Sequence, residues 1–196
     1  MSSPIQLQHV NVKLFASDEA RVDLEPLIPI FHGWIRDRVF EEMLLDVADY
    51  RHVHEGPGVM VIGHQANYSV DNTSGRLGVR YNRKAELDGT NQDRLKQAVR
   101  AALAAFQRLE SEDSLKGTLR FGGREMELLI NDRALAPNTD ATRSAAQPEL
   151  QAFFGTLFGG ADYALAHETE PRRLFTVRVR AAKAFSIAEL LANLGS

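Results

Sequence analysis

Cysteine is absent from this chain of 196 residues. Its absence excludes disulfide bonds, thiolate zinc sites, cysteine-ligated iron–sulfur clusters and cysteine nucleophiles. It also fits a reducing compartment, so we expect a cytoplasmic protein. The first residues lack the basic and then apolar pattern of a secretory signal. No apolar run approaches the roughly 20 residues that a membrane-spanning helix needs, and we therefore expect no membrane association.

A strong charge of either sign is missing as well. The formal net charge is −3, which provides no general attraction to nucleic acid, and we expect no nucleic-acid partner. Glycine-rich nucleotide loops, the helical zinc-protease motif and the serine nucleophile elbow are also absent. The sequence therefore indicates no particular cofactor and no established class of enzyme.

The composition that remains is that of an ordinary globular protein, with 44% hydrophobic and 25% charged residues. Periodicity and turn residues predict both strands and helices in the first half of the chain. We expect a helix at residues 92–109 capped by Thr90 or Asn91, a short or kinked helix near Pro29, and strands at residues 6–15, 43–53, 59–70 and 76–81.

The second half of the chain shows similar signals. A long polar loop is predicted at residues 134–145, before a helix that starts at Pro148. Gly122 and Gly123 predict the turn of a hairpin formed by residues 118–121 and 125–131. We also expect a hairpin at residues 163–166 and 174–179, and a last helix at residues 187–194 capped by Ser186.

These elements predict an α+β fold, with antiparallel sheets and helices packed on one face. Residues 68–81 resemble residues 163–179, because each stretch has a tyrosine-led strand, a polar turn and an Arg-Leu segment in the same order. This similarity suggests two related β-α-β-β-α lobes, although any two antiparallel hairpins look alike. The predicted lobes are residues 1–110 and 111–196, packed as two units or as a single domain.

Residues 44–68 hold three of the six histidines beside two aspartates. If residues 55–58 form a four-residue loop, Asp49 lies opposite His64 on the apolar face of a hairpin. Opposed strand residues have Cβ atoms about 5 Å apart, so the carboxylate could accept the imidazole N–H and raise its basicity. The pair could be catalytic, or Asp49 could simply satisfy a buried histidine; one extra loop residue would separate the two side chains.

His52 and His54 share a strand face and are therefore candidate metal ligands. A metal site needs a third ligand. In the same register His64 falls on the opposite face, which leaves Glu55 as the nearest substitute. The alternative is two solvent-facing histidines beside a turn.

Arginines recur on one strand face in both halves of the chain. Arg76 and Arg80 alternate with apolar residues, and so do Arg178 and Arg180. With Arg83 and Lys84 nearby, this sheet face could bind an anion, a phosphate or an acidic partner, or it could simply be solvated. Further candidate ligand contacts are Tyr50, Arg51 and Trp34, although a lone tryptophan more often belongs to the core.

Three functional hypotheses follow. The first is a non-catalytic module that binds a small ligand or a protein partner, and its open sheet edges would suit a homodimer. The second is an enzyme in which Asp49 orients His64 as a general base, with Tyr50, Arg51, His52 or His54 near the substrate. The third is a metal-binding protein that uses His52 and His54.

Overall fold

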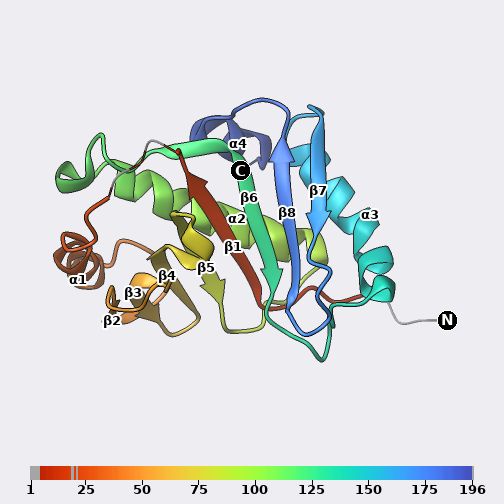
Figure 1. The fold of residues 1–196 in the computed structure, drawn as a ribbon, viewed down its shortest axis with the longest axis horizontal. Helices are drawn as coiled ribbons and strands as arrows, with labels where there is room; N and C mark the ends of the chain where they lie inside the picture. Colours follow the sequence, from red (N-terminus) through yellow and green to blue (C-terminus); the bar gives the residue numbers. More distant parts are fainter. Residues whose placement is uncertain (1–4, 19, 21, 196) are drawn as a thin grey trace.

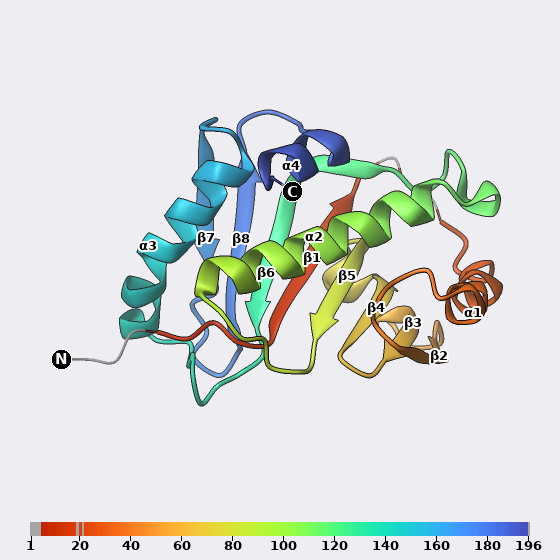
Figure 2. The ribbon, with the colours of Figure 1, turned by 180° about the vertical axis from the view of Figure 1, so that it is seen from behind.

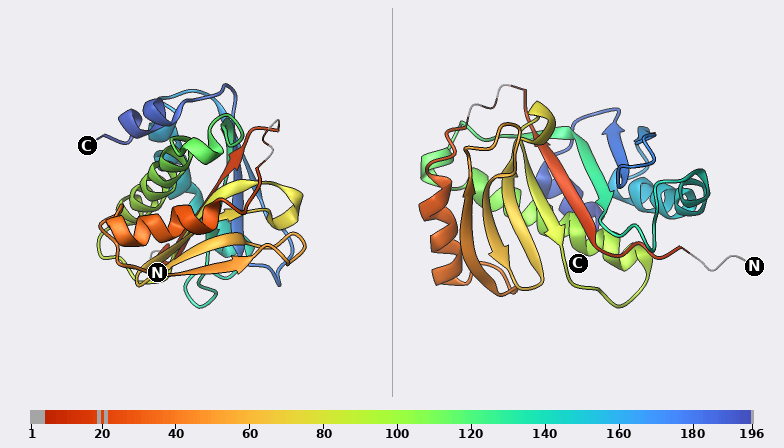
Figure 3. Two further views of the ribbon diagram at one scale, coloured as in Figure 1. Left: turned by 90° about the vertical axis from the view of Figure 1, so that its left-hand side faces the viewer. Right: turned by 60° about the horizontal axis from the view of Figure 1, so that its bottom comes forward.

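A computed structural model describes residues 5–18, 20 and 22–195. Its eight described strands form a single antiparallel sheet in the order β2-β3-β4-β5-β1-β6-β8-β7 (Figure 1). The sheet is strongly twisted, so that strands at its two ends run in different directions (Figure 3). The strands are β1 (Val10–Ala16), β2 (Leu44–Tyr50), β3 (Gly58–Gly63), β4 (Ala66–Asp71), β5 (Gly78–Arg83), β6 (Phe121–Ile130), β7 (Tyr163–His167) and β8 (Phe175–Ala181).

In the view of Figure 1, α2, α3 and α4 lie behind the sheet and α1 lies beside its β2–β3 end; α2 crosses several strands diagonally (Figure 2). They are α1 (Leu27–Asp37), α2 (Asn91–Glu110), α3 (Asp140–Leu157) and α4 (Ile187–Asn193). The predicted α+β class, with antiparallel strands and helices on one face, is confirmed. Among the described residues, none of the helices combines the length and apolar character needed to cross a bilayer.

The alternation of side chains along β1 separates the two faces of the sheet. Val12 and Leu14 are buried in the core on the helix side. The residue between them, Lys13, belongs to the opposite face, which we call the open face because no helix covers it in Figure 1. The register places Arg80 of β5 and Glu127 of β6 directly beside Lys13. Charged side chains from three adjacent strands therefore meet on the open face.

The predicted long helix is confirmed as α2. Thr90 caps it, because its side chain accepts a hydrogen bond from the Asp93 N–H while the Asp93 carboxylate accepts one from the Thr90 N–H. Leu95, Val99 and Phe106 follow at helical spacing and are buried against the sheet. The predicted Ser186 cap of α4 forms the same reciprocal arrangement.

Two of the predicted strand arrangements are wrong. Residues 59–70 divide into β3 and β4 at a tight turn, where a Cβ atom on Gly63 would lie 2.4 Å from the Ala66 carbonyl oxygen. Gly122 and Gly123 do not form a hairpin turn, because β6 runs through both residues. The β1–β6 register shifts beside them, and Gly123 has a φ of +75°. We therefore assign these glycines to a β-bulge within β6, which is another common role of glycine in a strand.

The predicted start of the third helix at Pro148 is also wrong. Thr139 caps α3, which begins at Asp140, so Pro148 lies inside the helix and part of the predicted loop is helical. The Thr139 side chain accepts a hydrogen bond from the Thr142 N–H. A proline removes one N–H from a helix without always ending it, and the earlier cap decides where this helix starts.

One sheet spans the predicted boundary between the lobes, because β1 pairs with β6 at its centre. The two stretches that resemble each other are equivalent hairpins, β4–β5 and β7–β8. In each hairpin the second strand pairs with the first strand of its own half. The first half contains two further strands, β2 and β3, and the duplication is not confirmed.

Candidate anion-binding site

The structure does not bring Asp49 and His64 together. Asp49 pairs with Val59 across the β2–β3 hairpin, so the predicted register is wrong. Residues 51–57 connect the strands, where the prediction assumed four residues, and local turns within this connection shift the pairing. His64 lies outside the strands, in the β3–β4 turn, where its N–H donates to the Met43 carbonyl oxygen.

Arg51 is the partner that Asp49 has instead. The Arg51 guanidinium donates to both Asp49 carboxylate oxygens at 2.8–3.1 Å. Arg51 holds the pKa of this exposed carboxyl down at about 2. Asp49 is therefore an ionised surface group near a loop, and the geometric basis of the Asp49–His64 enzyme hypothesis is lost.

The two histidines proposed as metal ligands lie in the β2–β3 connection and are exposed. The side chain of His54 is 96% exposed, and its nearest carboxylate, that of Glu55, is 3.9 Å away. Within the described part of the chain, no three His, Asp or Glu side chains are grouped so that they could hold a metal ion. The residues that the structure describes therefore supply no third ligand for His52 and His54.

Trp34 is a core residue and is only 1% exposed. Its ring lies against Phe31 and Phe40, and its Nε1–H donates to Glu112 at 3.4 Å. It offers no open face on which a ligand could stack. Tyr50, at the end of β2, is exposed.

Of the arginines predicted to share a sheet face, Arg76, Arg80, Arg178 and Arg180 converge on the open face. Arg83 instead lies on the helix side, where it pairs with the core residue Ala66 across the β4–β5 ladder. Arg80 and Arg178 each contact one oxygen of Glu127, at 3.4 and 3.1 Å. These three side chains form a first row across the strands. A second, parallel row lies closer to the loop at residues 72–77, where Arg76 and Arg180 each contact one oxygen of Glu125, at 2.7 and 3.2 Å. The strand register produces both rows, because Glu127 pairs with Arg178 and Glu125 with Arg180.

A buried ion pair anchors the first of these rows. The Lys13 Nζ donates to Asp71 Oδ1 at 2.6 Å, and both side chains are 3% exposed or less. Burial lowers the pKa of Lys13, and the neighbouring Asp71 carboxylate opposes that shift. Asp71 also faces the Arg80 guanidinium at 3.2 Å. Asp71, which Lys13 fixes in place, therefore holds one side of Arg80, while Glu127 holds the other.

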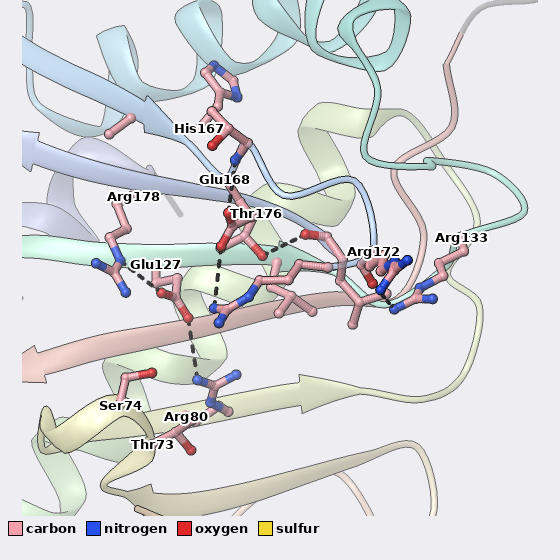
Figure 4. A pocket seen from close by; sticks show the side chains of 15 residues that line it. Thr73, Ser74, Arg80, Glu127, Arg133, His167, Glu168, Arg172, Thr176 and Arg178 are labelled. Atoms are coloured by element: carbon pink, nitrogen blue, oxygen red, sulfur yellow. Dashed lines mark hydrogen bonds and ion pairs between the residues drawn. The ribbon is translucent and has the colours of Figure 1, made fainter.

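A hollow of about 710 Å³ opens beside this row (Figure 4). Its lining comes from β5, β6, β7 and β8, from the turn after β4, from Arg133 and from the loop at residues 168–174. Five arginines and two glutamates line it, so the hollow is strongly basic although the chain as a whole is acidic. The lining arginines are Arg80, Arg133, Arg172, Arg173 and Arg178.

Two of these arginines lie at the same end of the hollow without a carboxylate partner among the described residues. The Arg133 Nη2 donates to the backbone oxygen of Arg172 at 2.6 Å, and this contact places the two residues together (Figure 4). The other three arginines each contact Glu127 or Glu168. The positive charge of the hollow is therefore least compensated at Arg133 and Arg172.

Glu168 organises the loop that carries Arg172 and Arg173. It accepts the backbone N–H groups of Thr169 and Glu170, at 2.9 and 3.0 Å, and lies 3.5 Å from the Arg173 guanidinium. The Glu170 N–H contributes most to lowering the pKa of Glu168. A carboxylate that stays ionised thus fixes the loop beside the hollow.

His167 lies at the margin of the hollow and packs against Phe175, with ring centroids 6.0 Å apart. Burial, and secondarily the charge of Arg143, lowers the pKa of His167. The imidazole is therefore neutral at physiological pH and adds no charge to the lining.

Sequence reasoning found Arg80 and Arg178 but missed Arg133, Arg172 and Glu127. The alternation of charge along β6 is visible in residues 125–127, and could have placed Glu127 on the arginine face. The loop residues Arg133 and Arg172 carry no periodic signal, because tertiary structure alone brings them together.

Comparison with models of known protein families and with curated proteins finds no match to this sequence.

Proposed function

We propose that this protein is a non-catalytic binding module whose arginine-lined hollow takes a small ligand with an acidic group. One observation carries the proposal: Arg133 and Arg172 line the same end of the hollow, and neither guanidinium forms an ion pair with a carboxylate among the described residues. Glu170 accepts only the backbone N–H of Arg172, at 3.2 Å. A guanidinium presents a planar set of N–H donors that matches phosphate and carboxylate oxygens.

Electrostatics favours an anion at this end of the hollow. Two positive charges at one end of a hollow repel each other, and a bound anion would attract both. The surrounding walls are formed by the sheet and the loop, so a ligand there would be screened less than on a flat surface. The volume of about 710 Å³ lies within the roughly 300–1,000 Å³ of small-molecule sites.

The carboxylates of the hollow favour binding over proton transfer. Glu127 contacts Arg80 through one oxygen and Arg178 through the other. Glu168 accepts backbone N–H groups and contacts Arg173. The lowered pKa of Glu168 makes this residue a poor general acid at neutral pH. Their role in this proposal is to fix the positions of the arginines.

Calorimetric titration with inorganic phosphate at constant ionic strength tests the proposal. Arg172→Gln should weaken phosphate binding about tenfold or more, because a charge-assisted hydrogen bond contributes about 1.5–3 kcal/mol. Arg36→Gln is the matched control, since Arg36 is an exposed arginine on α1 that pairs with its neighbour Asp37. Equal affinities of wild type and Arg172→Gln, or no binding at all, would contradict the proposal.

We also propose a homodimer in the cytoplasm. The sheet ends at β2 and β7, and an edge strand has backbone groups available for pairing with another chain. Met43 and Leu45, beside or within β2, are 66% and 52% exposed. The absence of cysteine supports the cytoplasmic location. Light scattering of the purified protein measures the oligomeric state directly.

A further inference from the structure

The basic charge of the hollow is distributed over two separate positions. Arg133 and Arg172 form the first position, with two positive charges and no carboxylate partner in the described chain. A phosphate monoester carries about −1.5 to −2 charges at pH 7, which matches this pair better than a single carboxylate does.

The second position lies where Arg80 and Arg178 share Glu127. With the buried pair beneath it, this group contains three cations and two anions, so one positive charge is uncompensated. The side chain of Arg178 is 54% exposed, so a ligand can reach it. Figure 4 shows these arginines on the opposite side of the hollow from Arg133 and Arg172.

Arg173 lies in the lining with the two positions and completes the basic surface. Its guanidinium is 3.5 Å from Glu168, a long contact between groups that are 70% and 26% exposed. An exposed ion pair of this kind contributes little stability. Arg173 can therefore turn toward a ligand anion at small cost.

Hydroxyl groups supply the rest of the polar lining. Thr73 and Thr176 donate their hydroxyl hydrogens within the chain, to Asp71 and to the Leu174 carbonyl oxygen, both at 3.0 Å. Their oxygens can still accept hydrogen bonds from a ligand. Ser74 and Thr169 also line the hollow. This lining suits a ligand that carries its own hydroxyl groups.

Among the described residues, no phenylalanine, tyrosine or tryptophan lines the hollow. The one ring present, that of His167, packs against Phe175. Stacking on an aromatic side chain contributes about 1–3 kcal/mol per base in sites that bind nucleotides. The hollow lacks such a platform, so its chemistry favours a non-aromatic ligand.

From these features we infer that the ligand is a bisphosphorylated sugar or similar polyol, with one phosphate at Arg133 and Arg172 and the other near Arg80 and Arg178. This inference rests on the proposed function and specifies its ligand class. The two phosphates use the two charged positions, the hydroxyl groups use the threonine and serine oxygens, and no aromatic group is required.

The test is calorimetric titration of the whole chain with four probes at one ionic strength. They are fructose 1,6-bisphosphate, fructose 6-phosphate, ADP and inorganic phosphate. We expect the bisphosphate to bind about tenfold or more tightly than either the monophosphate or ADP, since only it engages both positions without a base. Arg178→Gln should remove most of this preference, because it should weaken the bisphosphate much more than fructose 6-phosphate, and Arg172→Gln should weaken both sugars. Arg36→Gln again serves as the control.

The outcomes separate this inference from the proposed function. If the bisphosphate binds no more tightly than the monophosphate, or if ADP binds more tightly, the ligand class is wrong. In that case phosphate binding that depends on Arg172 would still support an anion site. If none of the four anions binds, both the ligand class and the proposed function are overturned.

Discussion

The helix side and the open side of the sheet each surround a carboxylate with hydrogen-bond donors, but they neutralise it differently. On the helix side, the Tyr68 and Tyr81 hydroxyls donate to Glu42 at 2.6 and 2.8 Å, and Arg83 lies 3.5 Å away. On the open side, Asp71 meets the Lys13 ammonium at 2.6 Å and the Arg80 guanidinium at 3.2 Å.

The two arrangements have different consequences for the surfaces around them. The tyrosines belong to the core, where Tyr68 stacks on Phe40, so the Glu42 cluster closes the packing at the start of β2. The Lys13–Asp71 pair instead supports Arg80, which lines the hollow. A charge buried on the helix side thus stabilises the fold, while the charges on the open side also shape a binding surface.

Removing the cation from the open side should have the largest effect on stability. Lys13→Met leaves Asp71 buried with only Arg80 as a charged partner, and we expect the free energy of unfolding to fall by about 3–5 kcal/mol. Urea unfolding measures the change. Lys13→Met combined with Asp71→Asn should recover part of the loss, because the second change removes the uncompensated charge. If Lys13→Met alone were as stable as wild type, the Lys13–Asp71 pair would contribute little to stability.

Raising the pH should test the helix side. Burial, followed by the charge of Glu42, raises the pKa of Tyr81 to about 12, whereas an unfolded tyrosine has a pKa of about 10. Between these values the unfolded chain has lost the proton that the folded protein keeps, so stability falls as pH rises. One pKa unit corresponds to about 1.4 kcal/mol, so the expected loss between pH 8 and pH 11 is about 1–2 kcal/mol, and the loss continues up to the folded pKa.

Urea unfolding of wild type and Tyr81→Phe at pH 8 and pH 11 separates this effect from other titrations. Tyr81→Phe should lose less stability than wild type over the same interval. Burial raises the pKa of Tyr68 as well, so the variant should keep part of the dependence. Identical pH dependence in both proteins would contradict the assignment to Tyr81.

The smallest effect on stability is expected at the exposed Asp49–Arg51 ion pair, at the end of β2. Asp49→Ala should leave the urea midpoint unchanged within error, because solvent already surrounds this carboxylate and Arg51. His64→Ala should behave in the same way, and the double variant should show no coupling between the two positions. Coupling between Asp49 and His64 would restore the predicted register and the catalytic hypothesis.

The sequence predicted best where the signal is local. The cap at Thr90 and the spacing of Leu95, Val99 and Phe106 specify α2 from nearby residues alone, and the structure confirms it. Alternation likewise placed Arg80 and Arg178 on one face, because side chains alternate along any strand.

The register and the hollow required information that no short segment contains. The length of the β2–β3 connection depends on turns at residues 51–57, and an error in that length misplaced Asp49 relative to His64. Arg133 and Arg172 are 39 residues apart. Only the assembled sheet brings them together, so no pattern in the sequence could join them.

The central position of β1 also constrains the order of folding. β1 pairs with β5, which ends at Arg83, and with β6, which ends at Ile130. During synthesis, the β6 side of β1 therefore has no partner until residue 130 has been made. Pairings so distant along the chain close slowly, because the loop entropy must be overcome before the contacts form. During synthesis the apolar residues of β1 are thus the segment most in need of protection from aggregation.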